Sequence, residues 1–342
     1  MFFRSGRGFL AGLLDLRNGQ KPEPGPGTRI PANAPHQTLM SQTTQSIGRG
    51  MTRYALITPV RDEEKYIGAM MESILAQQVR PAKWIIVDDG STDRTAEIIE
   101  SCARNAEFVE VVKLSRREQR EPGGEGAIAH ALRRLVLSEY DFLARFDADL
   151  LFEPDYIGRI LDEFERDAKL GIAGGGLYVE KGCRSELERV PEYHVRGALK
   201  MYRRQCFEQI GGITTRIGWD TIDEVYAWSK GWKTKSFFQY CVIHRRPTGE
   251  GIRANHIYWE RGKAEYYTWS HPLFVAGKTV KLAAEKFSLL KPFAFFAGFV
   301  SCYLRRESRI QDAVFVKTRR GQQRQRMFSL KKAARGARAE AG

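Results

Sequence analysis

The sequence is poor in cysteine, and its cysteines stand far apart. No Cys-x-x-Cys pair occurs, and their number is odd. This pattern argues against a disulfide framework and against a cysteine-based zinc site. A reducing cytoplasm is the compartment that fits it best. The cysteines are Cys102, Cys183, Cys206, Cys241 and Cys302.

Long hydrophobic runs are also missing. Residues 287–304 form the most apolar stretch, but Lys291 and Pro292 interrupt it, so its unbroken part is too short to span a bilayer comfortably. Lysines precede this stretch and arginines follow it. Such a pattern is typical of a helix in the headgroup layer, although a helix packed on the catalytic domain or on a second subunit has it too. We expect peripheral association with an anionic inner membrane surface, on its cytoplasmic face.

Acidic residues are scarce in the last part of the chain. The net charge is +14, and nine basic residues but only one acidic residue, Glu340, lie from Lys317 onward. Nucleic acid or an anionic membrane would attract such a tail, whereas a solvated terminus needs no partner. Because the tail has a single aromatic residue, Phe328, and no recognisable nucleic-acid motif, we expect no nucleic-acid partner.

Composition divides the chain into four segments. Residues 1–50 are rich in proline and small polar residues, which is typical of a linker or of disorder. Residues 51–250 carry the pattern of a catalytic domain, residues 251–312 that of a helical extension, and residues 313–342 form the basic tail. Met51 stands directly before the first predicted strand, so it is a second candidate for the start of translation.

Predicted strands and helices alternate through the catalytic segment. Apolar runs at residues 54–58, 84–89, 108–114 and 141–146 predict strands, and segments with apolar residues at helical spacing separate them. We expect the first strand to end at Pro59. Unbroken apolar strands between helices are typical of an α/β fold, with a Rossmann-like, mostly parallel sheet and helices on both faces.

Polar residues follow three of these strands. Thr58 and Pro59 end the first, Asp88 and Asp89 end the second, and FDADL ends the fourth. The carboxyl ends of parallel strands meet at one edge of a sheet, where ligands of such folds bind. The two aspartates of FDADL could share a divalent cation, Mg²⁺ or Mn²⁺, whose other ligands come from substrate phosphates.

Taken together, these motifs resemble family 2 glycosyltransferases with the GT-A fold. The resemblance rests on ALITPVRDEEKYIG, WIIVDDGSTDRTAEII and FDADL, and it covers roughly residues 53–250. It implies a site for a nucleotide-sugar donor and a metal ion. The implied donor-binding residues are Pro59, Glu63, Asp88, Asp89 and Asp147, and the implied metal ligands are Asp149, Asp147 and His244.

In this family the general base comes from a Glu-Asp pair that opens a helix ending near Gly-Trp. The matching segment is GWDTIDEVYAWSKGWK, in which Asp220 stands at the usual place and Trp219 replaces the glutamate. Asp223 lies one turn or less further along and is the alternative base. The resemblance implies an inverting single displacement, in which this aspartate takes the proton of the acceptor hydroxyl.

The resemblance implies a hexosyltransferase-type enzyme of surface polysaccharide biosynthesis, with a glycan or polyprenyl-linked acceptor. Processive synthases of the family have several membrane spans and a Gln-x-x-Arg-Trp motif. Neither is found here, so we expect transfer of one sugar. One rival, a sugar-phosphate nucleotidyltransferase on a related fold, would need a glycine-rich loop where TPVRDEE stands. The other, a non-enzymatic basic membrane- or nucleic-acid-binding protein, leaves Asp89, Asp149 and Asp220 without a purpose.

Overall fold

The chain forms one large folded unit and a smaller terminal one. The computed structural model describes residues 52–116, 125–181, 184–214, 216–246, 254–286 and 290–339. The large unit runs from Thr52 to Gln325, and the other comprises Met1–Met51 and Arg326–Gly342. The linker predicted at residues 1–50 lies outside the described residues.

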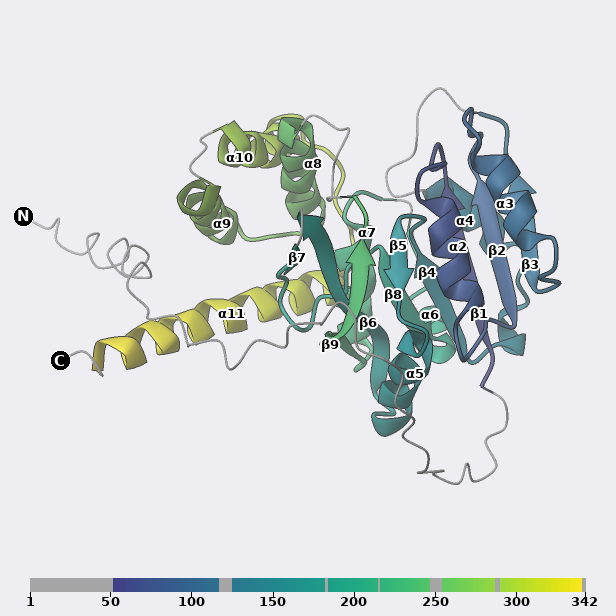
Figure 1. Cartoon of the computed structure of the whole chain (residues 1–342). Helices are drawn as coiled ribbons and strands as arrows, with labels where there is room; N and C mark the ends of the chain where they lie inside the picture. Colours follow the sequence, from purple (N-terminus) through teal and green to yellow (C-terminus); the bar gives the residue numbers. More distant parts are fainter. Residues whose placement is uncertain are drawn as a thin grey trace, which may run out of the picture. The chain divides into compact units, whose positions relative to one another are not determined.

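A nine-stranded mixed sheet forms the centre of the large unit (Figure 1). Its order is β3-β2-β1-β4-β8-β6-β9-β5, and β7 pairs with β6. The pairs among β1 to β4 are parallel, as is β6 with β9, whereas β8, β5 and β7 pair antiparallel. The strands are β1 (Tyr54–Val60), β2 (Lys83–Asp88), β3 (Val109–Lys113), β4 (Phe142–Phe146), β5 (Leu150–Phe152), β6 (Leu170–Lys181), β7 (Arg184–Leu187), β8 (Leu199–Arg203) and β9 (Lys233–His244).

Helices cover both faces of this sheet, as predicted. Along β1, Leu56 and Val60 pack with α2, α3 and α5, whereas Ala55 and Ile57 pack with α4, α6 and α7. This alternation follows from the two-residue period of a strand and explains why the strand is apolar throughout. The helices are α2 (Ile67–Leu75), α3 (Thr95–Ala103), α4 (Glu125–Leu132), α5 (Tyr156–Arg166), α6 (Arg204–Gln209) and α7 (Trp219–Ser229), with a 3-10 turn at Leu137–Glu139.

The prediction that the first strand ends at Pro59 was wrong. β1 continues through Pro59 to Val60, and these residues pair with Val87 and Asp88 of β2. The ladder with β4 ends at Ile57, so β1 has one free edge beyond that point. A proline is tolerated on a strand with a free edge because its missing N–H costs no hydrogen bond there.

The helical extension is confirmed, and its first three helices pack on one another. They are α8 (Ala254–Tyr267), α9 (Pro272–Lys286) and α10 (Leu290–Leu304), and α11 (Ala313–Ala339) follows. Two glycines let α8 and α10 approach closely. A Cβ on Gly262 would lie 1.9 Å from the Phe295 carbonyl oxygen, and one on Gly298 would lie 2.2 Å from the Trp259 carbonyl oxygen. None of the described helices is both long enough and apolar enough to cross a membrane.

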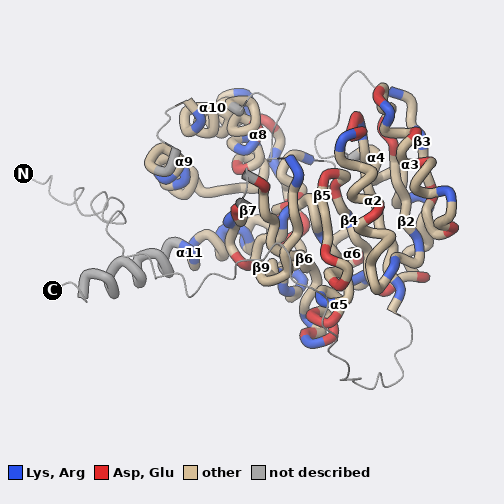
Figure 2. Tube along the Cα trace, in the orientation of Figure 1, with Lys and Arg blue, Asp and Glu red and all other residues tan. Residues whose placement is uncertain are grey.

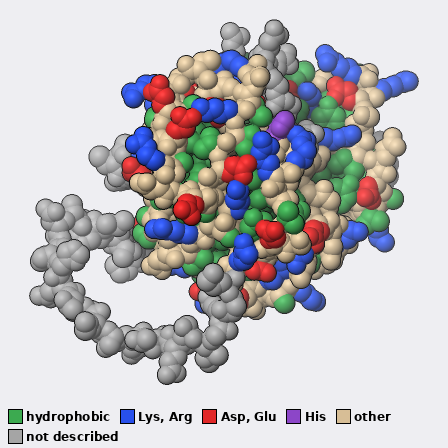
Figure 3. All heavy atoms as spheres, turned by 90° about the vertical axis from the view of Figure 1, so that its right-hand side faces the viewer, with side chains coloured by type: hydrophobic (Ala, Val, Ile, Leu, Met, Phe, Trp, Pro, Cys, Tyr) green, Lys and Arg blue, Asp and Glu red, His purple; other side chains and the backbone are tan. Residues whose placement is uncertain are grey.

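Charges of both signs are spread over the large unit. Acidic and basic positions are interspersed among the uncharged ones (Figure 2). On the face next to β3, side chains of both signs are mixed without a patch of one sign (Figure 3). The described side chains of this face therefore form no concentrated basic surface.

Candidate active site

The turns after β1 and β2 are tied together at the carboxyl edge of the sheet. The Asp62 carboxylate accepts a hydrogen bond from the Thr92 amide at 2.8 Å, and the Glu63 amide donates to the Thr95 hydroxyl at 2.7 Å. Asp62 has a positive φ of 53°, a conformation that aspartate adopts more readily than most residues. These bonds place Glu63, one of the predicted donor-binding residues, beside the end of β2.

Asp88 and Asp89 have different surroundings, although both are buried. Asp88 accepts hydrogen bonds from the Ser91 amide at 2.8 Å and the Ser91 hydroxyl at 2.6 Å, which closes the turn. Asp89 lies 3.6 Å from the Arg61 guanidinium. Gly90, in the same turn, has a φ of +74°, and a Cβ at this position would lie 2.4 Å from the Arg116 Cα, so the turn requires glycine here. The structure thus gives Asp88 a turn-holding role and leaves Asp89 as the better candidate for contact with a nucleotide.

Asp149 and His244 are brought together by the pairing of β5 with β9, in which Leu150 lies opposite His244. The His244 Nε2 lies 3.3 Å from the Asp149 Oδ2. Arg246 bridges two acids, at 3.0 Å from the Asp149 Oδ2 and 2.6 Å from the Glu63 Oε1. Burial alone would raise the pKa of Asp149, but the hydrogen bond and charge of His244 and the charge of Arg246 outweigh it and lower this pKa.

Asp147 is more exposed than Asp149, with 36% of its side chain accessible. Its Oδ1 lies 2.9 Å from Arg145, whose guanidinium stacks over the Trp219 ring at 4.5 Å. Trp219 opens α7, so Arg145 links the FDADL turn to the helix that carries the predicted base. Trp219 therefore serves in packing and orientation where the family has an acid.

The predicted metal site fits a partial, substrate-completed site. Among the described residues, no group of three or more His, Cys, Asp or Glu side chains lies close enough to hold a metal alone. Mg²⁺ at nucleotide sites commonly takes one or two carboxylates and completes its shell with phosphates and water. Asp149 with Asp147 offers those carboxylates. The His244 Nε2 faces Asp149 at 3.3 Å and the Nδ1 faces Glu188 at 4.0 Å, so His244 could join a cation at Asp149 only through Nε2. A cation here would share the Asp149 carboxylate with Arg246.

The two candidate bases differ sharply in accessibility. Asp223 is buried and bound by Lys200 at 2.8 and 2.9 Å and by the Tyr202 hydroxyl at 2.6 Å, and burial raises its pKa. Asp220 has 34% of its side chain exposed and lies 3.9 Å from His194. Burial would raise the pKa of Asp220, but His194, Lys200 and two arginines outweigh it and lower this pKa. The geometry favours Asp220 as the group that reaches a substrate.

Five further residues close to these side chains were not predicted from the sequence. His194 contacts the buried Glu224 at 2.9 Å, and the fully buried Lys200 lies 3.3 Å from the same acid. Arg196 pairs with Glu188, which in turn approaches His244. A lysine in the middle of an apolar strand, LKMYR, was the one sequence signal that could have pointed to a buried charge cluster.

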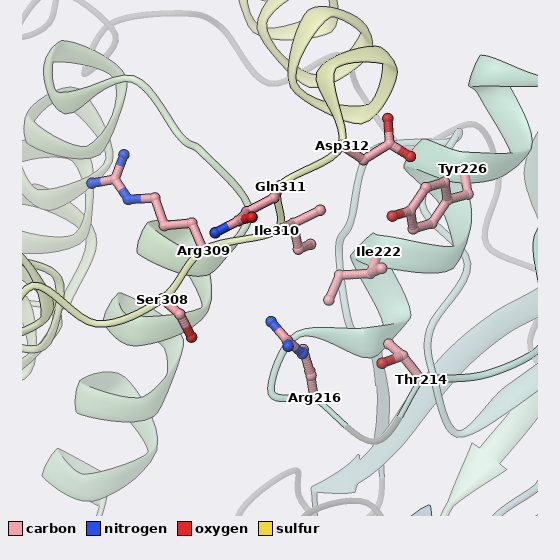
Figure 4. A pocket seen from close by; sticks show the side chains of 9 residues that line it. All are labelled: Thr214, Arg216, Ile222, Tyr226, Ser308, Arg309, Ile310, Gln311 and Asp312. Carbon is pink, nitrogen blue, oxygen red and sulfur yellow. The ribbon is translucent and has the colours of Figure 1, made fainter.

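A pocket lies on the side of α7 that faces away from Asp220. The pocket has a volume of about 460 Å³, and Ile222 and Tyr226 contribute to it from the side of α7 facing away from Asp220. Figure 4 shows Arg216 among these side chains, whereas Arg309 turns away toward three aromatic rings. The lining residues are Thr214, Arg216, Ile222, Tyr226, Ser308, Arg309, Ile310, Gln311 and Asp312.

Part of the chain that carries these residues matches a known protein family. Residues 55–219, which include the turn after β2, the FDADL turn and the start of α7, match the family described as Glycosyl transferase family 2. This region belongs to glycosyltransferase family 2. Within this family it is similar to poly-beta-1,6-N-acetyl-D-glucosamine synthase of Staphylococcus aureus, with 29% identity over 189 residues. It is also similar to chondroitin synthase of Escherichia coli, with 30% identity over 116 residues.

The matches differ in extent. The alignment to the staphylococcal synthase covers 54% of this chain and 44% of that protein, and the alignment to chondroitin synthase covers 34% and 16%. Among solved structures, the mannosyltransferase PcManGT of Pyrobaculum calidifontis, in complex with GDP-Man and Mn²⁺, has a TM-score of 0.48 and 17% identity, covering 85% of this chain and 76% of that one. TarS 1–349 of S. aureus has a TM-score of 0.46 and 15% identity, covering 75% and 73%.

Proposed function

We propose that this chain is a metal-dependent, inverting hexosyltransferase that moves one sugar from a nucleotide-sugar donor to a glycan acceptor in surface polysaccharide biosynthesis. The observation that carries the proposal is the link between the FDADL turn and the start of α7, in which Arg145 pairs with Asp147 and stacks over Trp219. Asp149 is held by His244 and Arg246, and the accessible Asp220 opens α7. The synthase relatives in the family favour polysaccharide as the product class.

The proposed reaction is a single displacement at the anomeric carbon. Asp220 accepts the proton of the acceptor hydroxyl. At the same time the oxygen of that hydroxyl bonds to the anomeric carbon, and the nucleoside diphosphate departs. A divalent cation at Asp149 and Asp147 would neutralise charge on the departing diphosphate. Arg246, next to Asp149, offers a second positive charge to the same group.

The acceptor side carries two arginines, which suits a phosphate-bearing acceptor such as a polyprenyl-linked one. α8 packs against the start of α7, since a Cβ on Gly218 would lie 3.0 Å from the Ala264 Cβ. Arg261 lies one turn before Ala264 on α8 and is close enough to Arg196 and Asp220 to interact electrostatically. Guanidinium groups bind phosphate well, so these two would hold the acceptor next to the base.

An apolar stripe on the extension favours membrane contact as part of this function. Phe293 and Phe296 of α10 are 71% and 41% exposed, and Leu273 of α9 is 73% exposed. Lys281 of α9 and Arg305, which directly follows α10, are also exposed. Aromatic and apolar side chains between cations are typical of a helix that lies in the headgroup layer, where a lipid-linked acceptor is found.

Transfer of one sugar, rather than polymerisation, is the finer part of the proposal. The α11 segment has Gln and Arg in the order of the processive motif, Gln323 and Arg326, but Met327 stands where that motif has Trp. Gln323 is buried and bonds to Ser270 and His271. Mass spectrometry of the products decides the point, because a ladder of lengths would overturn single transfer.

Calorimetric titration of UDP, GDP and dTDP, with and without Mn²⁺, tests the donor site. Wild type should bind one of them tightly only with Mn²⁺, and Asp149→Ala should lose this binding. Asp167→Ala is the matched control, because Asp167 is an exposed carboxylate that pairs with Lys233 away from the crevice. If wild type binds none of the three, or if Asp149→Ala binds like wild type, the donor site is wrong.

A further inference from the structure

A buried acid, a histidine and the proposed base form a row at the start of α7. The His194 Nδ1 lies 2.9 Å from Glu224, whose side chain is 1% exposed. The His194 Nε2 lies 3.9 Å from the Asp220 Oδ2. Glu224 also accepts a hydrogen bond from the Val195 amide at 2.7 Å, so it is held from two sides.

This geometry fixes the state of the imidazole. An ionised carboxylate can only accept hydrogen bonds. The Nδ1 of His194 therefore carries a hydrogen atom and donates a hydrogen bond to Glu224. In the neutral imidazole the Nε2 therefore has a free lone pair on the side of Asp220. A histidine oriented in this way by a carboxylate can accept a proton on its other nitrogen.

Charged groups surround the row on every element packed against it. Lys200 of β8 lies 3.3 Å from Glu224 and donates to the Asp220 carbonyl oxygen at 2.5 Å. Arg145 of β4 and Arg196, two residues after His194, act on Asp220 as positive charges. Arg261 of α8 is a further positive charge that interacts with Asp220. These cations favour the charged carboxylate of Asp220, which makes it a weak base that gains from a second proton acceptor.

We propose that His194 is a positioning residue and proton relay for Asp220, an inference that rests on the proposed transfer reaction. The acceptor oxygen bonds to the anomeric carbon, and the bond from that carbon to the diphosphate oxygen breaks with its electron pair. The acceptor proton moves to Asp220 and then, through one bridging water, to the His194 Nε2, which lies 3.9 Å from the Asp220 Oδ2. The imidazolium, balanced by Glu224, returns the proton to solvent after the products leave.

Two substitutions of His194 separate a relay from a structural role. His194→Asn keeps an amide donor at the position of Nδ1 for Glu224 and removes Nε2. His194→Gln places an amide at the position of Nε2 and gives up the bond to Glu224. His130→Asn, on α4, is the control for losing a histidine elsewhere in the chain.

The assay follows UDP or GDP release from UDP-GlcNAc, UDP-glucose, UDP-galactose and GDP-mannose, with polyprenyl-diphosphate-linked N-acetylglucosamine as the acceptor, across pH 5 to 9. Both His194 variants should lose about 10- to 100-fold in kcat, within the ~10²–10⁴ range of general acid–base groups, with KM for the donor unchanged. The pH–rate profile of both variants should differ from that of wild type, because the second proton acceptor is missing.

The outcomes distinguish this inference from the function on which it rests. If wild type transfers sugar and His194→Asn matches it in kcat and pH profile, the relay is refuted while the proposed function stands. If only His194→Gln is impaired, the histidine merely holds Glu224, and the relay is again refuted. If wild type transfers none of the four sugars although calorimetry shows donor binding, the proposed reaction fails and the relay with it.

Discussion

Replacement of Lys200 by methionine tests the charge balance beneath α7. The side chain is fully buried, and its ammonium group lies 2.8 Å and 2.9 Å from the two Asp223 oxygens and 3.3 Å from Glu224. Methionine fills a similar volume but carries no charge. Lys200→Met therefore leaves two buried carboxylates without their shared cation.

The expected cost follows from what remains in the core. Removing one partner of a buried ion pair costs roughly 3–5 kcal/mol of unfolding free energy, because the other charge stays buried and uncompensated. In a domain of this size each kcal/mol lowers Tm by about 2–4 °C, so Lys200→Met should melt roughly 6–20 °C below wild type. Urea denaturation and thermal melting of the full chain measure the two quantities.

Two further variants make the test specific. Lys233→Met removes an ion pair with Asp167 in which the two side chains are 61% and 36% exposed, and it should cost no more than about 1 kcal/mol. The double variant Lys200→Met with Asp223→Asn should regain part of the lost unfolding free energy, because Asp223→Asn removes one of the two uncompensated charges. A Lys200→Met protein within about 1 kcal/mol of wild type would refute the reasoning.

Two other predictions concern the extension. Burial would raise the pKa of Glu265, but Lys278 and Arg319 lower it to about 2, so this acid stabilises the fold above about pH 5 and the stabilisation is lost as pH falls toward 2. Glu265→Gln should therefore lose about 3 kcal/mol at pH 7, and urea melts that show the same deficit at pH 3 would contradict this. Phe293→Asp should weaken sedimentation with vesicles containing phosphatidylglycerol at least tenfold, whereas Val136→Asp, at an apolar position 59% exposed outside the extension, should not. Equal binding by the two variants would exclude α10 as the membrane contact.

The parallel direction of the strands near the site was predictable because it follows from local patterns. Unbroken apolar runs at residues 54–58 and 84–89 identify buried parallel strands, and their polar ends then meet at one edge. The end of the first strand was not predictable, since Pro59 is tolerated only because β4 stops pairing at Ile57. Such tolerance depends on a neighbouring strand that is remote in sequence.

The assembly of the site was harder to foresee for the same reason. Asp149 and His244 are nearly one hundred residues apart, and the pairing that joins them uses β5, which is three residues long. A strand so short leaves almost no period in the sequence. The resemblance to the family nominated both residues, but the ion pairs by which Arg246 bridges Asp149 and Glu63 were not predicted.

The choice between Asp220 and Asp223 shows how burial gives two similar residues different roles. They lie within one turn of α7, and helix position alone does not separate them. Lys200 and Tyr202 from β8 bind Asp223, and burial raises its pKa, whereas the partly exposed Asp220 has its pKa lowered by surrounding cations. Groups whose surroundings push their pKa values apart commonly mark a division of labour in an active site. This contrast supports our proposal that Asp223 anchors the helix through its buried bonds and that the accessible Asp220 meets the acceptor hydroxyl.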